Sequence, residues 1–376
     1  MRFPPLKAKS KKSRLMKNKT PDFYIKQTLR LAKKAEGHTS PNPLVGCVIV
    51  KNGRIIASGY HRQAGKNHAE REALLKAGPR ARGASLYVNL EPCSHYGRTP
   101  PCADMIIEKG IKEVVAAMPD PNPRVRGRGF KKIKSAGVRV RAGVMRSEAQ
   151  ELNRIFVKNM KHKMPYVFMK AGMSADGKIA LKNGKSKWIT SEQSRNHAQG
   201  LRKKADAILA GINTVLADNP RLDCRIDKRK RIKKVILDTR GRIPSNARLF
   251  RNTKKGEVFV FTSKMKRGKI TELEKKGAVV VFLKAITPKA VLKKLFEYGV
   301  MSVLVEGGSA VASSFIRSRL ADEIYLYIAP VIIGSDGLGY FGNMEFSKMR
   351  SVFRIEDRTI EKIGPDMLIR GRVKYV

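Results

Sequence analysis

The stretch between residues 68 and 102 constrains this chain more than any other part of it. It carries an imidazole at His68 and two thiols at Cys93 and Cys102, and Glu70 follows the imidazole by two positions. Imidazole and thiolate are ligands that zinc prefers, and three protein ligands leave a fourth position open for water, as in catalytic zinc sites. The chain is therefore expected to fold so that three separate segments meet at one metal ion.

The residues around these ligands agree with a known pattern. His-x-Glu followed by Pro-Cys-x-x-Cys is typical of zinc deaminases, in which the metal acidifies a water molecule and the glutamate carries protons. Glu70 is accordingly expected to be catalytic and not a ligand. The alternative is a chance His-x-Glu with two cysteines that serve as small buried apolar residues. Three elements in the same order favour the zinc site.

The spacing of the two cysteines departs from that pattern. Eight residues, and not two, separate Cys93 from Cys102, and the additional loop carries His95 and Arg98. We expect this loop at the mouth of the site, where an arginine can hold a phosphate through two parallel hydrogen bonds. The alternative is that Arg98 is only a solvated loop cation.

Length and composition limit the class of protein. A chain of 376 residues is long enough for two domains, and it contains no apolar run that could span a membrane. Four cysteines are too few for a disulfide framework, and no secretion signal opens the chain. We therefore expect a protein of the reducing cytoplasm.

The chain is strongly basic. Lys and Arg number 79 against 31 Asp and Glu, a formal charge of +48, and the excess is divided almost evenly between the first 150 residues and the rest. A specific nucleic-acid surface should instead gather its charge in one place, so only weak adhesion to polyanions is expected. Residues 1–20 are basic and free of acid, which predicts a disordered arm; an organelle transit segment is the alternative.

The first half alternates strands with helices. A helix is predicted from Thr20 to about Glu36, followed by strands over 45–50 and 55–60 around a tight turn. His68 is placed at the entry of the helix over 70–76, because positions two apart do not share a helix face. Cys102 begins another helix, strands follow over 113–118 and 138–141, and residues 120–123 and 127–129 are read as loops. This alternation indicates a layered α/β domain.

The second half shows the same alternation. An amphipathic helix over 146–163 is expected to link it to the first, and strands are predicted at 166–171, 207–210, 235–238, 258–262 and 303–305. The turn at Gly307 and Gly308 lies between a strand and a helix, where backbone N–H groups can bind phosphate, although an ordinary tight turn is the alternative. No G-x-G-x-x-G occurs, so a Rossmann domain is not supported.

Taken together, the motifs resemble those of the bifunctional riboflavin-biosynthesis deaminase–reductases of bacteria, from about Asp22 to the C-terminus. The motifs that carry this resemblance are Pro41–Gly46, His68–Glu70, Glu91–Cys102, Asp120–Pro123, Ser174–Lys178, Trp188–Ser191, Thr214–Pro220 and Val305–Gly308. The wide spacing of the cysteines is a feature of this family.

The resemblance implies a domain plan and two activities. A basic arm (1–20) would precede a cytidine-deaminase-like αβα domain (21–146), a linking helix (147–164) and a dihydrofolate-reductase-like α/β domain (165–376). The first domain would use zinc to hydrolyse the 2-amino group of a diaminopyrimidinone that carries ribosylamino 5′-phosphate. The second would use NADPH to reduce the ribosyl unit to ribityl. The partner would be this small phosphorylated pyrimidine, with neither a specific nucleic acid nor a membrane, and a homo-oligomer is compatible.

The resemblance also assigns residues. In the first domain it implies metal ligation by His68, Cys93 and Cys102, proton transfer by Glu70, and substrate contacts from Asn42, His95 and Arg98. In the second domain it implies substrate contacts from Ser186, Arg202, Leu222, Arg225 and Glu306, and NADPH contacts from Gly172, Trp188, Thr214, Asp218, Thr239 and Gly308. From the residues alone Asn42 could equally cap a turn and Trp188 could equally pack in the core. Asp218 is the candidate for proton handling during ring opening.

Two other functions remain open at this stage. An RNA-acting zinc deaminase would fit the basic charge, but it calls for a clustered basic surface, aromatic stacking and the short cysteine spacing, and aromatic residues make up only 7%. A basic binding protein with a structural metal is the non-enzymatic alternative. Ammonia release that depends on zinc separates it from both enzymes. The sequence also leaves open whether both domains are active.

Overall fold

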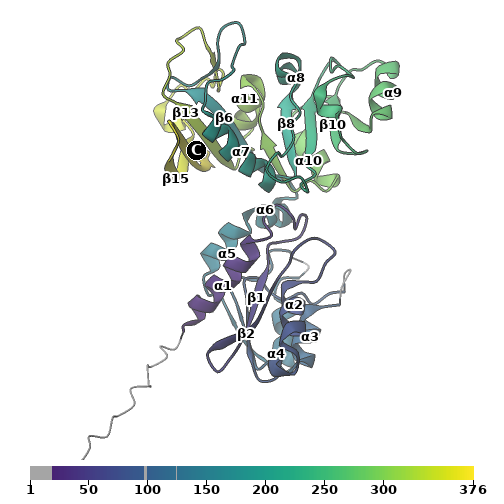
Figure 1. The fold of residues 1–376 in the computed structure, drawn as a ribbon, viewed down its shortest axis with the longest axis vertical. Coiled ribbons are helices and arrows are strands. Elements are labelled where there is room, and N and C mark those ends of the chain that lie inside the picture. The colour runs from purple at the N-terminus through teal and green to yellow at the C-terminus, as the bar shows by residue number, and fades with distance from the viewer. Residues whose placement is uncertain (1–18, 97–99, 124) are drawn as a thin grey trace, which may run out of the picture.

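The computed structural model describes residues 19–96, 100–123 and 125–376. Their strands form two main sheets, one of five strands (β1–β5) and one of nine. Two helices, α5 and α6, lie in the chain between the last strand of the first sheet and the first strand of the second. Figure 1 shows the five-stranded part below, the nine-stranded part above and α6 at the junction. Arg98 and nearly all of the predicted basic arm lie outside the described residues, so predictions for them stay predictions.

The five-stranded sheet has the order β2-β1-β3-β4-β5, antiparallel between its first three strands and parallel between its last three. Its elements are α1 (Pro21–Lys33), β1 (Gly46–Lys51), β2 (Arg54–Tyr60), α2 (Ala69–Ala77), η1 (Gly78–Ala81), β3 (Ser85–Val88), α3 (Cys102–Glu108), β4 (Glu113–Ala116), α4 (Arg128–Ser135) and β5 (Arg139–Ala142).

Helices cover both faces of this sheet, α1 on one side and α2 to α4 on the other (Figure 1). Two glycines allow the close approach. A Cβ on Gly46 would lie 2.1 Å from the carbonyl oxygen of Thr28 in α1, and one on Gly59 would lie 2.5 Å from that of Ala69 in α2. The expected αβα layering is therefore present, and strand β1 is buried from Gly46 to Val50 between the layers.

One loop prediction in this part is wrong. Residues 127–129 were expected to form a loop, but α4 begins at Arg128, with Gly127 as its N-cap at a φ of 80°. Gly129 lies inside this helix, and only a glycine fits there because a Cβ would come within 2.0 Å of the carbonyl oxygen of Pro92. The glycines that suggested a loop are instead required by this close contact.

The predicted linking helix is two helices, α5 (Arg146–Leu152) and α6 (Arg154–His162). Asn153 divides them, because its side chain bonds the backbone of Leu44 in the first part of the chain. Its Oδ1 accepts from Leu44 N at 2.8 Å and its Nδ2 donates to Leu44 O at 3.0 Å. A tertiary contact thus interrupts a helix that its local sequence would continue.

The nine-stranded sheet has the order β11-β10-β9-β8-β12-β6-β13-β16-β15. The strands from β11 to β13 are parallel, and β16 pairs antiparallel with both β13 and β15. Its part of the chain contains β6 (Tyr166–Ser174), β7 (Lys178–Ala180), α7 (Glu192–Lys204), β8 (Ala207–Gly211), α8 (Ile212–Asp218), β9 (Lys233–Leu237), η2 (Arg248–Phe250), β10 (Val258–Thr262), α9 (Arg267–Lys275), β11 (Ala278–Phe282), α10 (Pro288–Glu297), β12 (Ser302–Val305), α11 (Ser309–Arg317), β13 (Glu323–Ala329), β14 (Leu338–Gly339), η3 (Met349–Ser351), β15 (Arg354–Ile363) and β16 (Asp366–Lys374).

Two apolar clusters lie on opposite faces of this sheet. Along β6, Phe168 belongs to one cluster, while Val167 and Met169 belong to the other. Neighbouring residues of a strand point to opposite faces, so a strand buried on both sides reads as a continuous apolar run. Among the helices of the described residues, none combines the length and the apolar character that a membrane span requires.

Candidate active sites

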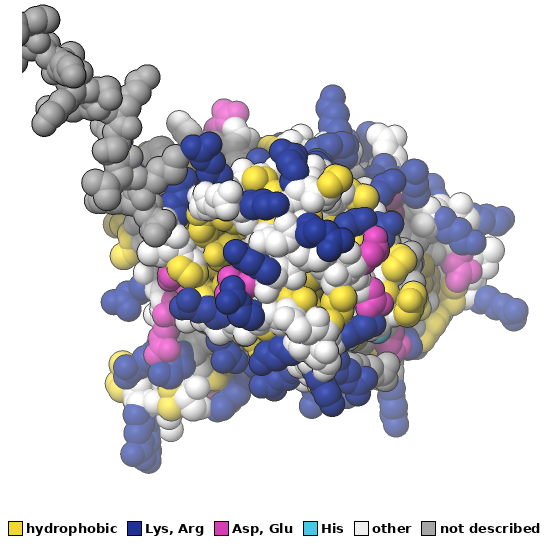
Figure 2. Space-filling view, turned by 90° about the horizontal axis from the view of Figure 1, so that it is seen from below, with side chains coloured by type: hydrophobic (Ala, Val, Ile, Leu, Met, Phe, Trp, Pro, Cys, Tyr) yellow, Lys and Arg dark blue, Asp and Glu magenta, His cyan; other side chains and the backbone are white. Residues whose placement is uncertain are grey.

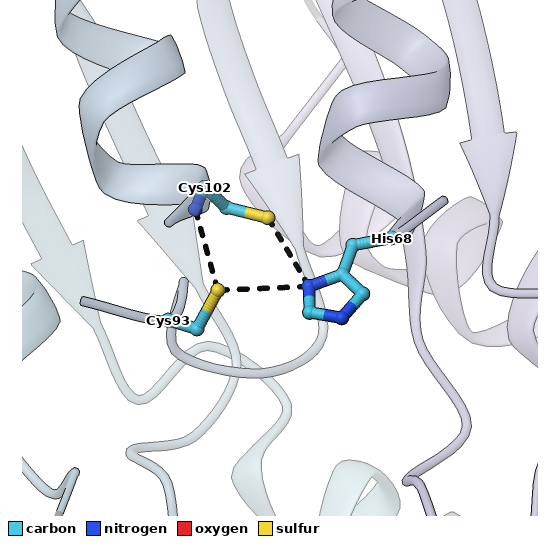
Figure 3. A group of neighbouring side chains, drawn as sticks. All are labelled: His68, Cys93 and Cys102. Atoms are coloured by element: carbon cyan, nitrogen blue, oxygen red, sulfur yellow. Dashed lines mark hydrogen bonds between the residues drawn. The ribbon is translucent and has the colours of Figure 1, made fainter. Parts of the chain in front are cut away.

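The three predicted metal ligands meet in the first domain. Cys93 Sγ lies 3.5 Å and Cys102 Sγ 3.4 Å from Nδ1 of His68, and all three donor atoms lie within 4.8 Å of one another. Figure 3 shows the two thiols and the ring nitrogen pointing toward a common point. A tetrahedral zinc with usual bond lengths places a nitrogen and a sulfur ligand about 3.5 Å apart. The donor set therefore fits zinc in both chemistry and spacing.

The fold explains why these residues meet. His68 is the N-cap of α2 and Cys102 is the first residue of α3, while Cys93 lies in the loop after β3. The positive ends of two helices thus face the site, which favours a thiolate there, although the hydrogen bond with Cys93 and burial raise the pKa of the Cys102 thiol. Hydrogen bonding by Cys102 and His68 lowers the pKa of the Cys93 thiol despite its burial. The expected position of His68 at a helix entry is confirmed.

Glu70 stands in the first turn of α2, and its side chain is almost fully buried (4% exposed). Burial raises the pKa of this carboxyl to about 7, against the opposing effect of the nearby His68 charge. A carboxyl group with a pKa near neutrality can both take up and release a proton at physiological pH. Glu70 therefore has the properties of a general acid and base.

A cavity of about 520 Å³ opens beside these residues. Asn42 and His95 line it together with His68, Glu70 and Cys93, whereas the predicted Arg98 lies outside the described residues. The side-chain nitrogen Nδ2 of Asn42 lies 3.1 Å from Nε2 of His61. His61 Nδ1 lies 3.0 Å from the carbonyl oxygen of Asn67 and must donate to it, so Nε2 accepts from Asn42.

Several residues of this cavity were missed from the sequence. His61 and Asp120 line it, and burial raises the pKa of Asp120 to about 6. The loop over 120–123 follows strand β4, so its position at the sheet edge was a usable signal. Phe156 and Met160 also line the cavity, but they come from α6, and nothing local in the sequence connects that helix to the first domain.

Glu91, another residue without a predicted role, organises the wall of the cavity. Its Oε2 accepts from the backbone N–H groups of Asp120 and Gly127, each at 3.0 Å. Its Oε1 accepts from those of Gly129 (3.0 Å) and Phe130 (3.2 Å). The buried carboxylate thus joins the loop before Cys93 to the start of α4.

In the second domain, the predicted residues gather at one edge of the nine-stranded sheet. Parallel strands bring their carboxyl ends to the same edge, where open α/β sheets bind ligands. The predicted residues on or just beyond these ends are Gly172 of β6, Thr214 and Asp218 after β8, Thr239 after β9, and Glu306 and Gly308 after β12. Gly172 is a position of close approach, since a Cβ there would lie 3.1 Å from Oγ1 of Thr190.

Arg202 and Glu306 form a buried pair at this edge. Arg202 donates from Nε to Oε1 at 3.0 Å and from Nη2 to Oε2 at 2.7 Å, and its Nη1 donates to the carbonyl oxygen of Asp223 at 2.8 Å. These three bonds use most of the N–H donors of Arg202, which leaves few for a substrate phosphate. The side chain of Arg225, in contrast, is exposed. Lys170, unpredicted, lies close enough for its charge to lower the pKa of Glu306.

The loop before α7 carries Ser186 and Trp188. Trp188 is 69% exposed, so the alternative that it packs in the core is wrong. The guanidinium carbon of Arg195 lies 4.3 Å from its ring centroid, a cation–π contact that fixes the indole at the surface. Lys187 Nζ lies 3.2 Å from Oδ1 of Asp218, which links this loop to α8.

Leu222 occupies an unusual backbone position. Its side chain is buried (3% exposed), and its φ is 54°, a backbone conformation that residues other than glycine rarely adopt. The following segment packs on α7, since Arg225 N donates to Oε1 of Gln199 at 3.0 Å. Leu222 and Arg225 are thereby held beside the Arg202–Glu306 pair.

Comparison with known proteins supports the same division into two domains. Residues 18–118 match the model of the cytidine and deoxycytidylate deaminase zinc-binding region, and residues 165–369 match that of the RibD C-terminal domain. The chain is 44% identical over 347 residues to riboflavin biosynthesis protein RibD of Aquifex aeolicus, with 92% of this chain and 96% of that protein covered.

Solved structures show the same likeness over nearly the whole chain. One form of Acinetobacter baumannii RibD superposes with a TM-score of 0.87 at 38% identity, covering 94% of this chain and 99% of that one. A diaminohydroxyphosphoribosylaminopyrimidine deaminase/5-amino-6-(5-phosphoribosylamino)uracil reductase from Thermotoga maritima superposes with a TM-score of 0.81 at 35% identity, covering 95% and 99%.

Fold and sites thus define a zinc-dependent deaminase joined in one chain to an NADPH-dependent reductase. The chain belongs to the RibD family of bifunctional deaminase/reductases of riboflavin biosynthesis. The predicted fold class, a cytidine-deaminase-like domain followed by the reductase domain, is confirmed.

Proposed function

We propose that this enzyme converts 2,5-diamino-6-(5-phospho-ribosylamino)pyrimidin-4-one to 5-amino-6-(5-phospho-ribitylamino)uracil in two steps. We assign deamination to residues 21–146 and reduction to residues 165–376, with residues 147–164 as the link. The observation that carries this assignment is the cluster of His68, Cys93 and Cys102 beside buried Glu70, in one cavity with Asn42. The name of the Thermotoga maritima relative, which includes both activities, supports this assignment.

For deamination we assign the metal to His68, Cys93 and Cys102. When bound there, zinc acidifies a water molecule and makes it a nucleophile at neutral pH. Glu70 takes a proton from the attacking water and delivers protons to the ring nitrogen and the leaving amine, which departs as ammonia. Its raised pKa suits both directions of transfer.

Asn42 orients the base in this proposal. His61 holds one amide N–H of Asn42, which leaves the carbonyl oxygen and the second N–H for the edge of the pyrimidine. His95, exposed at the edge of the cavity, and Arg98 are placed toward the phosphate. An Asn42→Asp variant keeps the size of the side chain but loses both amide N–H groups, so it should bind the pyrimidine more weakly.

For reduction we assign NADPH to the carboxyl edge of the large sheet. Gly172, Trp188, Thr214, Asp218, Thr239 and Gly308 are the proposed cofactor contacts. The space around Gly308 supports this assignment, since no other atom lies within 4 Å of a Cβ built there, at the N-cap of α11. The bound cofactor supplies the hydride that reduces C1′ of the ribosyl unit.

On the substrate side of the reductase site we place Ser186, Arg202, Leu222, Arg225 and Glu306. Because Glu306 holds Arg202 through two bonds, Arg202 acts mainly in the pair, and the exposed Arg225 is the freer phosphate contact. Asp218 handles the proton during ring opening. Full reductase turnover in an Asp218→Asn variant would remove Asp218 from this role.

We further infer a cytoplasmic enzyme of small molecules, with no specific nucleic-acid partner. Lys and Arg side chains are scattered over the face in Figure 2 and do not form one stripe, which supports this inference. A homo-oligomer stays compatible with the fold. The test of the whole proposal is to incubate zinc-loaded enzyme with the diaminopyrimidine ribotide. Ammonia should appear first and NADPH oxidation should follow, whereas NADPH oxidation without ammonia would contradict the proposed order.

A further inference from the structure

The segment that joins α1 to β1, residues 36–44, contacts the reductase domain before it reaches the deaminase cavity. Ser40 Oγ donates to Oδ2 of Asp206 at 2.9 Å. Lys230 Nζ donates to the carbonyl oxygen of Gly37 at 2.7 Å. Two residues beyond Ser40, Asn42 lines the cavity. One short segment therefore belongs to the domain interface and to the deaminase site at once.

The contact leaves little room for movement. Gly37 has a φ of 85°, and a Cβ built on it would lie 2.2 Å from the carbonyl oxygen of Lys203 at the end of α7. Next to it, His38 Nε2 lies 3.1 Å from Oδ2 of Asp227. The backbone of the segment thus packs directly on the backbone of the reductase domain.

Asp206 is a fixed point in that domain. Its Oδ2 accepts from Met301 N (3.0 Å), Ser302 N (3.1 Å) and Ser302 Oγ (3.2 Å). These bonds hold the carboxylate at the amino ends of β8 and β12. The proposed NADPH and substrate residues follow the carboxyl ends of the same strands. The Asp206 contact and the proposed reductase site therefore lie at opposite ends of β8 and β12, so a change at the contact should not disturb that site directly.

We propose that Ser40 and Asp206 are positioning residues for deamination, through which the reductase domain holds the Asn42 loop in its binding conformation. The proposal rests on the proposed role of Asn42 in orienting the base. It gives the fusion of the two domains a physical consequence, because one domain supplies the support for a substrate contact of the other.

The local geometry shows how the support reaches Asn42. Asn42 N donates to the carbonyl oxygen of Thr39 at 2.8 Å, so residues 39–42 form a closed turn that moves as a unit with Ser40. Beyond it, Asn153 bonds both backbone groups of Leu44. The turn is held on both sides by residues from outside the deaminase sheet. Such preorganisation places a binding group before the substrate arrives.

The test is the Ser40→Ala variant of the full chain, assayed for both activities. Loss of a hydrogen bond to a carboxylate should raise the KM of deamination about tenfold and change kcat little. Zinc content and reductase kinetics with the deaminated intermediate should equal those of the parent enzyme, and the loss of one hydrogen bond should lower the free energy of unfolding by only about 1 kcal/mol. Ser40→Thr keeps the hydroxyl and should restore the deaminase KM. An unchanged deaminase KM in Ser40→Ala would overturn the proposal.

Two further variants distinguish this proposal from general tethering of the domains and from a failure of the proposed role of Asn42. Glu151 in the linking helix α5 pairs with Arg372 of the reductase domain and makes no hydrogen bond or ion pair with the described residues 36–44, so Glu151→Gln should leave the deaminase KM unchanged. An equal rise in Glu151→Gln and Ser40→Ala would mean general domain tethering and would overturn the proposal. Asn42→Asp tests the role of Asn42 itself. If Asn42→Asp raises KM but Ser40→Ala does not, the positioning idea fails while the proposed function stands.

Discussion

Arg202 of α7 and Glu306 at the end of β12 are joined by two parallel hydrogen bonds of 3.0 and 2.7 Å, and both side chains are largely buried. Such a fork fixes the position of both groups, because the guanidinium plane must align with the carboxylate. The pair ties the helix that follows the Trp188 loop to the strand end that carries the glycine turn.

We expect Arg202→Lys to disable the reductase selectively. A lysine is a point charge that cannot reproduce the fork, so one oxygen of the buried carboxylate would lose its partner. Reductase kcat/KM should fall by a factor of about 10², corresponding to about 3 kcal/mol. Ammonia release should be unaffected, which serves as the internal control. Equal losses of both activities would point to general misfolding instead.

The same pair predicts how stability changes with pH. Burial raises the pKa of Glu306, but the Arg202 guanidinium, aided by Lys170 and Arg225, lowers it to about 2. Because this pKa is lower in the folded than in the unfolded chain, the carboxylate stabilises the fold above the unfolded pKa of about 4.5. That contribution, about 3 kcal/mol, is lost as the pH falls toward 2.

Urea unfolding of the parent enzyme and of Glu306→Gln checks this expectation. The parent should be the more stable protein at pH 7, and its advantage should shrink steadily as the pH falls below about 4.5. If the stability difference between the parent enzyme and Glu306→Gln stays constant between pH 6 and pH 3, ionised Glu306 does not contribute to stability as expected.

Glu91→Gln should destabilise the deaminase domain. Each carboxylate oxygen accepts two backbone N–H groups, and the amide would turn an NH2 group toward one of these pairs. The free energy of unfolding should fall by about 2–3 kcal/mol. Glu108→Gln is the matched control, because Glu108 is exposed and its ion pair among the described residues is with Lys109; it should change the free energy of unfolding by less than about 0.5 kcal/mol.

Cys93→Ser should remove zinc from the enzyme and abolish ammonia release. A serine hydroxyl is a poor replacement for a soft thiolate at a site built from sulfur and imidazole. Metal analysis and ammonia assays check this, with Cys224→Ser as the control, since that buried thiol lies in the reductase domain. Full zinc content in Cys93→Ser would show that the zinc is bound by other residues.

Sequence reasoning worked where the physical cause was local. Three correct predictions depend on neighbouring residues alone: the turn at Asn52 and Gly53 between two strands, the Thr20 cap and the entry of α2 at His68. The sequence also predicted the cluster of His68, Cys93 and Cys102, because the spacing pattern and the ligand chemistry together are specific.

It failed where distant residues decide. Asn153 breaks the linking helix because it bonds Leu44, and Gly129 is a glycine within α4 because the backbone of Pro92 leaves no room for a side chain. His61 could not be recognised as the partner of Asn42 without the hairpin that brings them together. The domain interface at Asp206 has no sequence signature at all, since its partner Ser40 is 166 residues away.

The most direct measurement of the central claim combines metal analysis with both assays on Glu70→Gln. The glutamine keeps the size of the side chain but cannot carry a proton. Zinc content and NADPH oxidation with the deaminated intermediate should match the parent enzyme, while ammonia release should fall by a factor of about 10²–10⁴. Undiminished ammonia release from Glu70→Gln, or a parent enzyme that binds no zinc, would contradict the account.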